Sequence, residues 1–359
     1  MRLAVNSRLY AEKGTGISNY IRDLYGALLP MAEKRHEVVF IQQQDKVTLG
    51  KTIIVPGSES RLDALLFDVL RFGQAAKGAT IIHATSFGIP IWPFFKGRRV
   101  VTIHDLSFMT NPASSDLVSR LYFKGLVTLA VRRADKLLYY SQQTRHDLEK
   151  LFAVAPDRMC YAPLGAAPLF EVQPAQPAFY QGEYCLSVTT HPRRKNIFAA
   201  LEAFSKLSGH EKLMYCIAGK MSAEYQDELR AKAQEFGIAD KVVLLGFVDD
   251  LQLLSLYQHA RCLIYPSFYE GFGIPILEAV FSNCPVITSN VSSMPELLPN
   301  QDWLVDPYSV PSIAEKLQVI LDLSPADRKK VLATNLAFAQ QFSWKRCAEA
   351  TLACFESLV

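Results

Sequence analysis

Short apolar runs alternate with longer segments of helical period along this chain, and the alternation occurs twice. Short apolar runs are typical of strands buried on both faces, and strands that alternate with helices are typical of a doubly wound parallel sheet. A chain of 359 residues is long enough for two such domains. The pattern therefore predicts an α/β protein with two Rossmann-like domains in tandem.

The expected elements divide the chain between these domains. Strands are expected at 3–5, 37–41, 52–55, 81–83, 100–103, 136–140 and 159–161, and again at 184–188, 214–218, 242–245, 262–265, 286–288 and 303–305. Helices are expected near 17–30, 61–76, 115–134 and 142–152, and near 196–207, 222–236, 250–259, 274–282 and 310–323. We therefore place a first domain at 1–168, a Pro-rich linker at 169–182, a second domain at 183–341, and a helix at 342–359 that could pack on either domain.

The cysteines and the hydropathy of the sequence indicate the cellular compartment of the protein. The seven cysteines are scattered, form no CxxC pair and mostly lie within apolar runs, so we expect buried free thiols. No run approaches the roughly 18 apolar residues of a membrane helix, and the first residues lack the apolar region of a secretion signal. We expect a cytoplasmic protein. No Asp-x-Asp and no cluster of His, Cys or carboxylates is present, so no metal or other cofactor is expected.

Charge is distributed unevenly between the two halves. Residues 1–168 carry 22 Lys and Arg against 14 Asp and Glu, a balance of +8, whereas 169–359 carry 16 against 21, a balance of −5. The basic half could face an anionic acceptor or the inner face of the cell membrane, and an ordinary solvated surface explains the asymmetry equally well. Nucleic acid is disfavoured, because the sequence has no dense basic tract and no nucleic-acid-binding motif.

The segment after the strand at 262–265, PSFYEGFGIPILEA, is hard to explain by packing alone. Its glycines allow a sharp turn, and Pro275 suits the first turn of a helix. The backbone N–H groups of Phe272, Gly273 and Ile274 would then point at an anion. Glu270 and Glu278 flank this site, which is electrostatically costly unless hydroxyl groups bind there too. A diphosphate between a ribose and a hexose would supply them, and two surface glutamates on a strand–turn–helix are the alternative.

The segment YEGFGIPILE (269–278) resembles the Glu-x7-Glu motif of retaining glycosyltransferases of the GT-B fold, family 4 in particular. The similarity continues through LGFV (245–248), YPS (265–267), PVITSNVSSMPELL (285–298) and VDP (305–307). It implies two Rossmann-like domains that face each other across a cleft, with a nucleotide sugar bound by the second. Overall similarity is greatest to bacterial polysaccharide and O-antigen mannosyltransferases, which makes GDP-mannose the first candidate donor, ahead of dTDP-rhamnose and the UDP-sugars.

The resemblance also implies roles for residues of the second domain. Glu270 would contact hydroxyls of the transferred sugar and Glu278 the ribose. In THPRRKN (190–196), Arg194 and Lys195 would neutralise the diphosphate as it leaves, without a metal ion. The family usually has Gly near Thr189, so the backbone here is expected to approach the phosphates less closely.

Weaker motifs complete the expected donor site. The family binds the nucleotide base where Gly246, Phe247 and Val248 follow a strand, whereas without that context a packed Phe is the more probable explanation of the motif. Lys220 is placed for a phosphate, or is a solvated strand-end lysine. Gly14 and Gly16, in GTGISNY, match a loop that closes over the donor phosphates; the third Gly of a dinucleotide fingerprint is absent, which argues against a nicotinamide enzyme.

Polar residues at strand ends of the first domain are candidates for the acceptor side. His104 and Asp105 follow one strand, and the family places a His there near the sugar and acceptor. A structural histidine is the alternative. His83 and Ser141 also lie at strand ends, and Ser141 is more simply explained as a helix N-cap with Thr144 three residues on.

No carboxylate stands out as the nucleophile of a double displacement. We therefore expect a front-face mechanism, in which the acceptor hydroxyl attacks from the side the nucleotide leaves. A sugar phosphorylase, a nucleotide-sugar epimerase and a binding protein without turnover are the alternatives. The basic, apolar segment 117–134 could dock on a bilayer that carries a lipid-linked acceptor, or pack on the first sheet.

Overall fold

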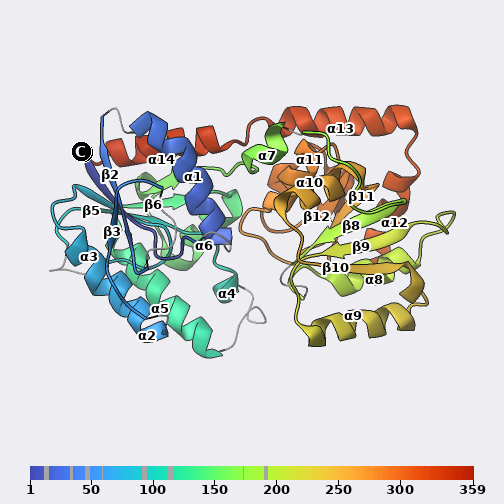
Figure 1. Ribbon diagram of the computed structural model, residues 1–359, viewed down its shortest axis with the longest axis horizontal. Coiled ribbons are helices and arrows are strands. Elements are labelled where there is room, and N and C mark those ends of the chain that lie inside the picture. The colour runs from blue at the N-terminus through green and yellow to red at the C-terminus, as the bar shows by residue number, and fades with distance from the viewer. Residues whose placement is uncertain are drawn as a thin grey trace. The chain divides into compact units, whose positions relative to one another are not determined.

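Two all-parallel sheets organise the chain, as the double alternation predicts (Figure 1). The computed structural model describes residues 1–11, 16–32, 35–44, 49–58, 60–90, 95–110, 117–172, 174–189 and 193–359. The chain divides into two units, which we call unit 1 (1–164 with 343–359) and unit 2 (165–342). The helix that the sequence could assign to neither domain therefore belongs to unit 1.

The sheet of unit 1 has the strand order β3-β2-β1-β4-β5-β6-β7. Its strands are β1 (Arg2–Asn6), β2 (Glu37–Gln42), β3 (Thr52–Ile54), β4 (Ile81–Ala84), β5 (Arg98–Thr102), β6 (Lys136–Tyr139) and β7 (Met159–Tyr161). The helices are α1 (Gly16–Ala32), α2 (Arg61–Leu66), α3 (Phe72–Ala75), α4 (Ser107–Thr110), α5 (Leu117–Arg133), α6 (Gln142–Phe152) and α14 (Trp344–Glu356). The direction of the order reverses between β1 and β4, the switch point where open α/β sheets bind ligands.

Burial explains why these strands read as continuous apolar runs. Val5, Ile82 and Val101 are fully buried, because helices cover both faces of the sheet. On one face α5 packs Val127 and Ala130 into a cluster with Val101. The packing of segment 117–134 on the first sheet is therefore confirmed for the described residues, and its contact with a bilayer stays a prediction.

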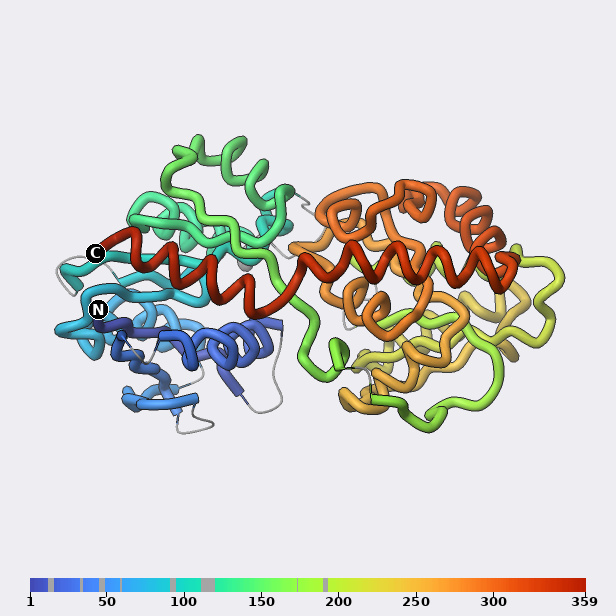
Figure 2. Tube along the Cα trace, turned by 90° about the horizontal axis from the view of Figure 1, so that it is seen from above, coloured from blue at the N-terminus to red at the C-terminus, as the bar shows by residue number. Residues whose placement is uncertain are grey.

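The C-terminal helix α14 covers part of unit 1, where Figure 2 shows it in red. The ring of Trp344 lies 6.1 Å from that of Tyr20 in α1, and the ring of Phe355 lies 5.3 Å from that of His83. Cys347 donates a hydrogen bond to the carbonyl oxygen of Ala162 at 3.5 Å. The helix therefore contributes apolar core to a unit whose other elements precede it by about 180 residues.

The sheet of unit 2 has the order β10-β9-β8-β11-β12-β13. Its strands are β8 (Tyr184–Val188), β9 (Met214–Ala218), β10 (Val242–Gly246), β11 (Cys262–Tyr265), β12 (Val286–Ser289) and β13 (Leu304–Val305). Its helices are α7 (Pro168–Val172), α8 (Ile197–Ser205), α9 (Ala223–Glu235), α10 (Asp250–His259), α11 (Ile274–Phe281), α12 (Val310–Leu321) and α13 (Pro325–Ala339). The pairing of β8 with β11 brings the segments after these two strands together.

The structure departs from the expected elements in three places. The helix expected near 61–76 is interrupted by a π-helical turn (Phe67–Arg71), within which Asp68 accepts hydrogen bonds from Asn6 and Arg8. The segment 169–182 is assigned to unit 2, and its first residues form α7, which places Phe170 5.9 Å from the ring of Tyr257. The helices α4, α7 and α13 had no counterpart among the expected elements.

The cysteine prediction is confirmed, because all seven are free thiols and only Cys160 is partly exposed. No helix in the described part of the chain is long and apolar enough to cross a membrane. Within the same residues, no three His, Cys, Asp or Glu side chains come together as a metal site would require.

Candidate functional site

The loop between β11 and α11 is held in place by a set of hydroxyl groups from the segment after β12. Ser292 and Ser293 donate hydrogen bonds to the carbonyl oxygen of Glu270 at 2.8 and 2.9 Å. Ser293 also reaches the carbonyl oxygen of Phe272 at 2.9 Å. These hydrogen bonds join the backbone of the loop to the segment after β12, so they fix the path of the loop before α11.

The loop ends at Gly273, which has a left-handed φ of +106° and caps α11 without a side-chain hydrogen bond. A Cβ atom at this position would lie 3.1 Å from Leu297 Cδ1, so the site favours glycine by conformation and by space. Pro275 follows in the first turn of α11, as predicted. The segment Phe272, Gly273 and Ile274 therefore does lead into a helix N-terminus, the arrangement that favours an anion.

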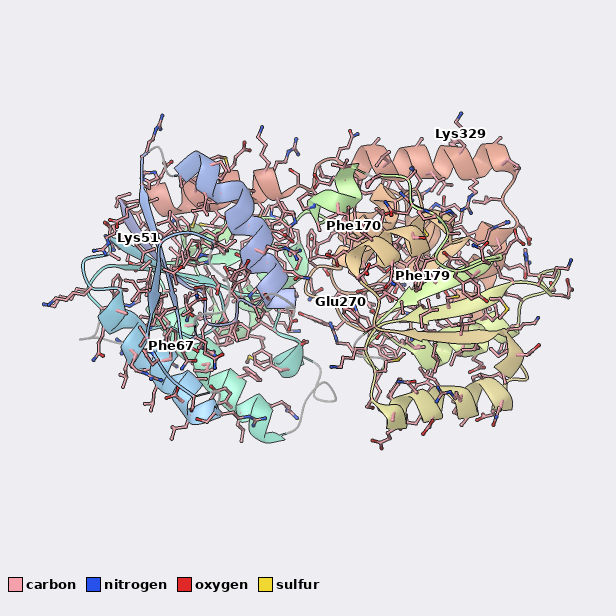
Figure 3. The ribbon with its side chains drawn as sticks, in the orientation of Figure 1. Lys51, Phe67, Phe170, Phe179, Glu270 and Lys329 are labelled. Atoms are coloured by element: carbon pink, nitrogen blue, oxygen red, sulfur yellow. The ribbon has the colours of Figure 1, made fainter. Side chains whose placement is uncertain are left out.

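Three charged side chains meet beside this helix, around Glu270, which is labelled in Figure 3. Lys195 Nζ lies 2.8 Å from Glu270 Oε1, and Arg194 Nη1 lies 3.1 Å from Glu270 Oε2. The side chains of Glu270 and Lys195 are only 7% and 10% exposed, whereas that of Arg194 is 27% exposed. Arg194 also donates to the carbonyl oxygen of Tyr269 at 3.0 Å. The sequence placed these charges in one pocket, and the structure shows them in direct contact.

The contacts set the ionisation of the cluster. Burial by itself raises the pKa of Glu270, but the charges of Lys195 and Arg194 together hold that pKa below its ordinary value. Burial lowers the pKa of Lys195 to about 8, although Glu270 opposes the shift. Near neutral pH the cluster therefore holds a carboxylate and two cations, with one positive charge in excess.

Two buried tyrosines complete the cluster, and the sequence interpretation missed both. The hydroxyl of Tyr265, at the end of β11, is hydrogen-bonded to Lys195 Nζ, which lies 4.2 Å from the centre of its ring. The hydroxyl of Tyr257, in α10, donates to Glu278 Oε2 at 3.0 Å. Both side chains are almost fully buried. For Tyr265, the signal in the sequence was a hydroxyl-bearing side chain in the otherwise apolar strand CLIY (262–265).

The weaker donor-site candidates occupy the carboxyl ends of neighbouring strands. Gly246 ends β10 with a φ of +68°, and Phe247 after it is 68% exposed, so it is not the packed side chain that was the alternative. Val248 is half-buried and Lys220, after β9, is exposed. Their roles stay predictions.

Thr189, where the family usually has Gly, packs against Gly219. A Cβ atom on Gly219, whose φ is +135°, would lie 1.6 Å from the carbonyl oxygen of Thr189. Thr189 donates its N–H to the carbonyl oxygen of Ala218 at 2.8 Å. Position 219 therefore requires glycine, and the looser approach of Thr189 to the phosphates stays a prediction.

The acceptor-side candidates lie in unit 1. His104 Nε2 contacts the carbonyl oxygen of Thr85 at 2.7 Å and its Nδ1 contacts the hydroxyl of Tyr140 at 3.0 Å. Burial lowers the pKa of His104, although Thr85 and Asp105 oppose the shift. The ring is therefore neutral and fixed by both nitrogens, whatever its role.

The other predicted residues of unit 1 have local structural partners. Asp105 accepts hydrogen bonds from the N–H and hydroxyl of Ser107, at the start of α4. Ser141 is fully buried and caps α6, accepting from the N–H of Thr144 at 3.1 Å, so the N-cap interpretation is confirmed. Gly16 begins α1, and Gly14 lies outside the described residues, as do residues 190–192 of THPRRKN.

Comparisons with known proteins agree along the chain. The profile of Glycosyl transferases group 1 matches residues 171–335 and that of Glycosyltransferase Family 4 matches 14–167. The O-antigen chain mannosyltransferase B of Escherichia coli is 32% identical over 289 residues, which are 77% of this chain and 74% of the relative. The serotype-specific mannosyltransferase WbdA of Escherichia coli is 27% identical over 316 residues, 80% of this chain but only 38% of that longer protein.

Among solved structures, sucrose-phosphate synthase from Thermosynechococcus elongatus matches with a TM-score of 0.77 at 20% identity. The match covers 100% of this chain and 99% of the other. At this identity the likeness concerns the fold alone, and it confirms the GT-B class for these two parallel-sheet domains.

Proposed function

This chain belongs to the GT-B glycosyltransferases of family 4 (glycosyl transferases group 1), and from that premise we propose a retaining hexosyltransferase that uses GDP-mannose. The acceptor we propose is a growing or lipid-linked glycan of a cell-surface polysaccharide. The names of two relatives, an O-antigen chain mannosyltransferase and a serotype-specific mannosyltransferase, support this donor and acceptor.

The observation that carries the proposal is the buried ion pair of Glu270 with Lys195 and Arg194 at the start of α11. The excess positive charge and the helix N-terminus would hold the donor diphosphate, and Glu278 would accept a hydrogen bond from the ribose. Glu270, kept ionised by its two partners, would accept hydrogen bonds from hydroxyls of the transferred mannose.

The same geometry favours front-face transfer. A carboxylate nucleophile would have to be free beneath the anomeric carbon, whereas both oxygens of Glu270 are held by cations. In the proposed step the bond between the anomeric carbon and the diphosphate oxygen breaks as the acceptor oxygen bonds to that carbon from the same face. The acceptor proton passes to the departing diphosphate, whose charge Lys195 and Arg194 stabilise. Catalysis would then come from positioning and charge, with no metal ion.

A thermal-shift panel tests the donor. GDP, UDP and dTDP at millimolar concentration should raise the melting temperature unequally, with GDP first; a ligand at 100 times its Kd adds about 2.7 kcal/mol. A larger rise with UDP or dTDP would show that the donor carries another nucleotide, and the proposed site would remain. No rise with any of the three would contradict the site.

Transfer from GDP-mannose to mannose-containing oligosaccharides tests the reaction. An α-linked product with turnover preserved in EDTA is expected. A β-linked product would contradict retention, loss of turnover in EDTA would contradict the metal-free mechanism, and phosphate-dependent release of mannose phosphate would identify a phosphorylase instead.

We also propose peripheral contact of α5 with an anionic membrane at the cytoplasmic face. Leu121 is 61% exposed on this helix, near the exposed Lys124, Arg132 and Arg133. Such a face combines an apolar contact with positive charge. Flotation with liposomes should require anionic lipid, and equal flotation of the L121D/K124E variant would contradict this contact.

A further inference from the structure

We infer that Tyr265 is a positioning residue whose hydroxyl holds the ammonium group of Lys195 beside Glu270 and stabilises its positive charge. The inference rests on the proposed function, because it assigns Lys195 to the donor diphosphate. It gives a role to a residue of the YPS segment (265–267), to which the resemblance assigned none.

The backbone fixes where the Tyr265 ring can lie. Tyr265 is the last residue of β11, its Cα is paired with that of Thr288 in β12, and its carbonyl oxygen accepts a hydrogen bond from the Thr288 hydroxyl at 2.9 Å. The residue is 2% exposed. Lys195, by contrast, is a long flexible side chain on the segment after β8. A rigid phenol beside a flexible ammonium group can therefore decide where that ammonium group rests.

The hydroxyl lies between a cation and an anion. It accepts a hydrogen bond from Lys195 Nζ, and the nearby carboxylate of Glu270, which is ion-paired with the same Nζ, helps to keep the phenol neutral. Burial, followed by the charge of Glu270, raises the pKa of Tyr265 well above its ordinary value. The phenol thus stays protonated while Lys195 titrates, and it can act as acceptor toward the ammonium and donor toward the carboxylate at once.

Phenylalanine would keep the ring and remove only this link. The contact between Nζ and the ring, at 4.2 Å from its centre, would remain. The charged form of Lys195 would lose one acceptor in a buried site, where hydrogen bonds to charged groups matter most. The protonated lysine should therefore become less stable relative to the neutral lysine.

Several charged groups face Lys195 and set its protonation together with Tyr265. Glu270, from the loop before α11, and Glu278, in α11, favour the ammonium, whereas Arg194 and burial oppose it. Burial, the largest of these effects, lowers the pKa of Lys195 to about 8, close to physiological pH. A modest further loss would leave the lysine largely neutral when the donor binds.

The test is the affinity for GDP, measured by calorimetry between about pH 5 and 9.5. The wild-type chain should lose affinity as the pH rises through the pKa of Lys195. In Y265F the midpoint of this loss should move down by about one to two pH units, the equivalent of one hydrogen bond to a charged group. Affinity well below the midpoint should be nearly preserved, which separates this effect from general damage to the site.

Two further variants serve as controls for this measurement. K195R should lose the alkaline midpoint, because a guanidinium stays protonated over this range. Y215F is the matched control: Tyr215 lies in β9, which β8 separates from β11, and is as buried as Tyr265. Its hydroxyl shares a hydrogen bond of 2.7 Å with Ser187. Its midpoint should equal that of the wild-type chain.

An unchanged midpoint in Y265F, or a wild-type affinity that does not depend on pH in this range, would overturn the inference and leave the nucleotide site intact. Failure of the wild-type chain to bind GDP, UDP and dTDP would instead overturn the proposed function, and this inference with it. If Y265F does not fold, fluorine NMR of the wild-type chain labelled with 3-fluorotyrosine replaces it. One tyrosine signal should shift with the pH midpoint of the GDP affinity and should lose that shift in K195R; the absence of such a signal would also overturn the inference.

Discussion

Replacing Glu270 by glutamine removes one negative charge from the cluster while keeping the shape of the side chain. Lys195, 2.8 Å from one carboxylate oxygen, and Arg194, 3.1 Å from the other, would then lose the counter-ion that they share. Breaking a buried ion pair costs about 3–5 kcal/mol. Since the Arg194 side chain is 27% exposed and also bonded to Tyr269, the lower end, about 3 kcal/mol, is expected. For a domain of this size that is a fall in Tm of about 6–12 °C.

A matched control is the ion pair of Arg193, the residue before Arg194 in the sequence. Glu228 pairs with Arg193 at 2.9 Å, but these side chains are 34% and 74% exposed. Because exposed pairs are hydrated and screened, E228Q should cost less than about 1 kcal/mol. Scanning calorimetry of the two variants compares the same chemical change in a buried and an exposed pair.

The pH dependence provides a second signature. Lys195 has a pKa of about 8 in the folded chain, below its ordinary value of 10.5, and loss of Glu270 lowers the folded value further. Between the folded and unfolded pKa the unfolded chain binds more protons, so this lysine makes stability rise with pH in that window. In E270Q the rise in stability begins at lower pH, because the folded pKa of Lys195 is lower. The difference in stability between E270Q and the wild-type chain should therefore shrink from pH 6 toward pH 8. Equal losses of Tm in E270Q and E228Q, or a deficit independent of pH, would refute the reasoning.

Three further substitutions separate structural from functional roles. Burial lowers the pKa of His83 to about 3, so the free energy of unfolding should fall by about 1.4 kcal/mol for each pH unit below pH 6.5. Urea denaturation of H83Q should show a weaker dependence of this free energy on pH. An equal dependence would count against a neutral buried ring. G219A places a methyl group against the carbonyl oxygen of Thr189 and should not yield soluble folded protein, whereas G237A, at φ +69° in open space, should cost only about 1 kcal/mol; similar denaturation midpoints for the two would contradict the packing. S141A should lose about 1 kcal/mol of stability with its helix cap, and a loss of mannose transfer at unchanged stability would place Ser141 in the acceptor site instead.

The strands of both sheets fall on the apolar runs identified in the sequence, because a strand buried on both faces has no polar face to interrupt the run. The helix α13 was not predicted from the sequence, because its side chains are mostly not buried. Of its residues only Asn335 and Ala339 are buried, so its apolar periodicity is weak. Its start was nevertheless readable: Ser324 caps it by accepting from the N–H of Asp327, with Pro325 in the first turn.

The charged residues of the site were predictable singly, but their mutual contacts were not. Arg194 and Lys195 follow β8 and Glu270 follows β11, so their pairing depends on which strands are neighbours in the sheet. The contact of Tyr265 with Lys195 spans 70 positions of sequence. Residue type and spacing indicate a pocket, whereas the partner of each charge within it is a tertiary property.

The placement of α14 has a consequence for biosynthesis. During translation the elements of residues 1–164 emerge first, yet the helix that packs against α1 and His83 follows only after unit 2. At about 5–20 residues per second, the roughly 180 intervening residues take on the order of 10–35 seconds to appear. Through that interval the nascent first sheet keeps apolar surface uncovered, a binding opportunity for chaperones, while unit 2, continuous in sequence, can complete its own core on the ribosome.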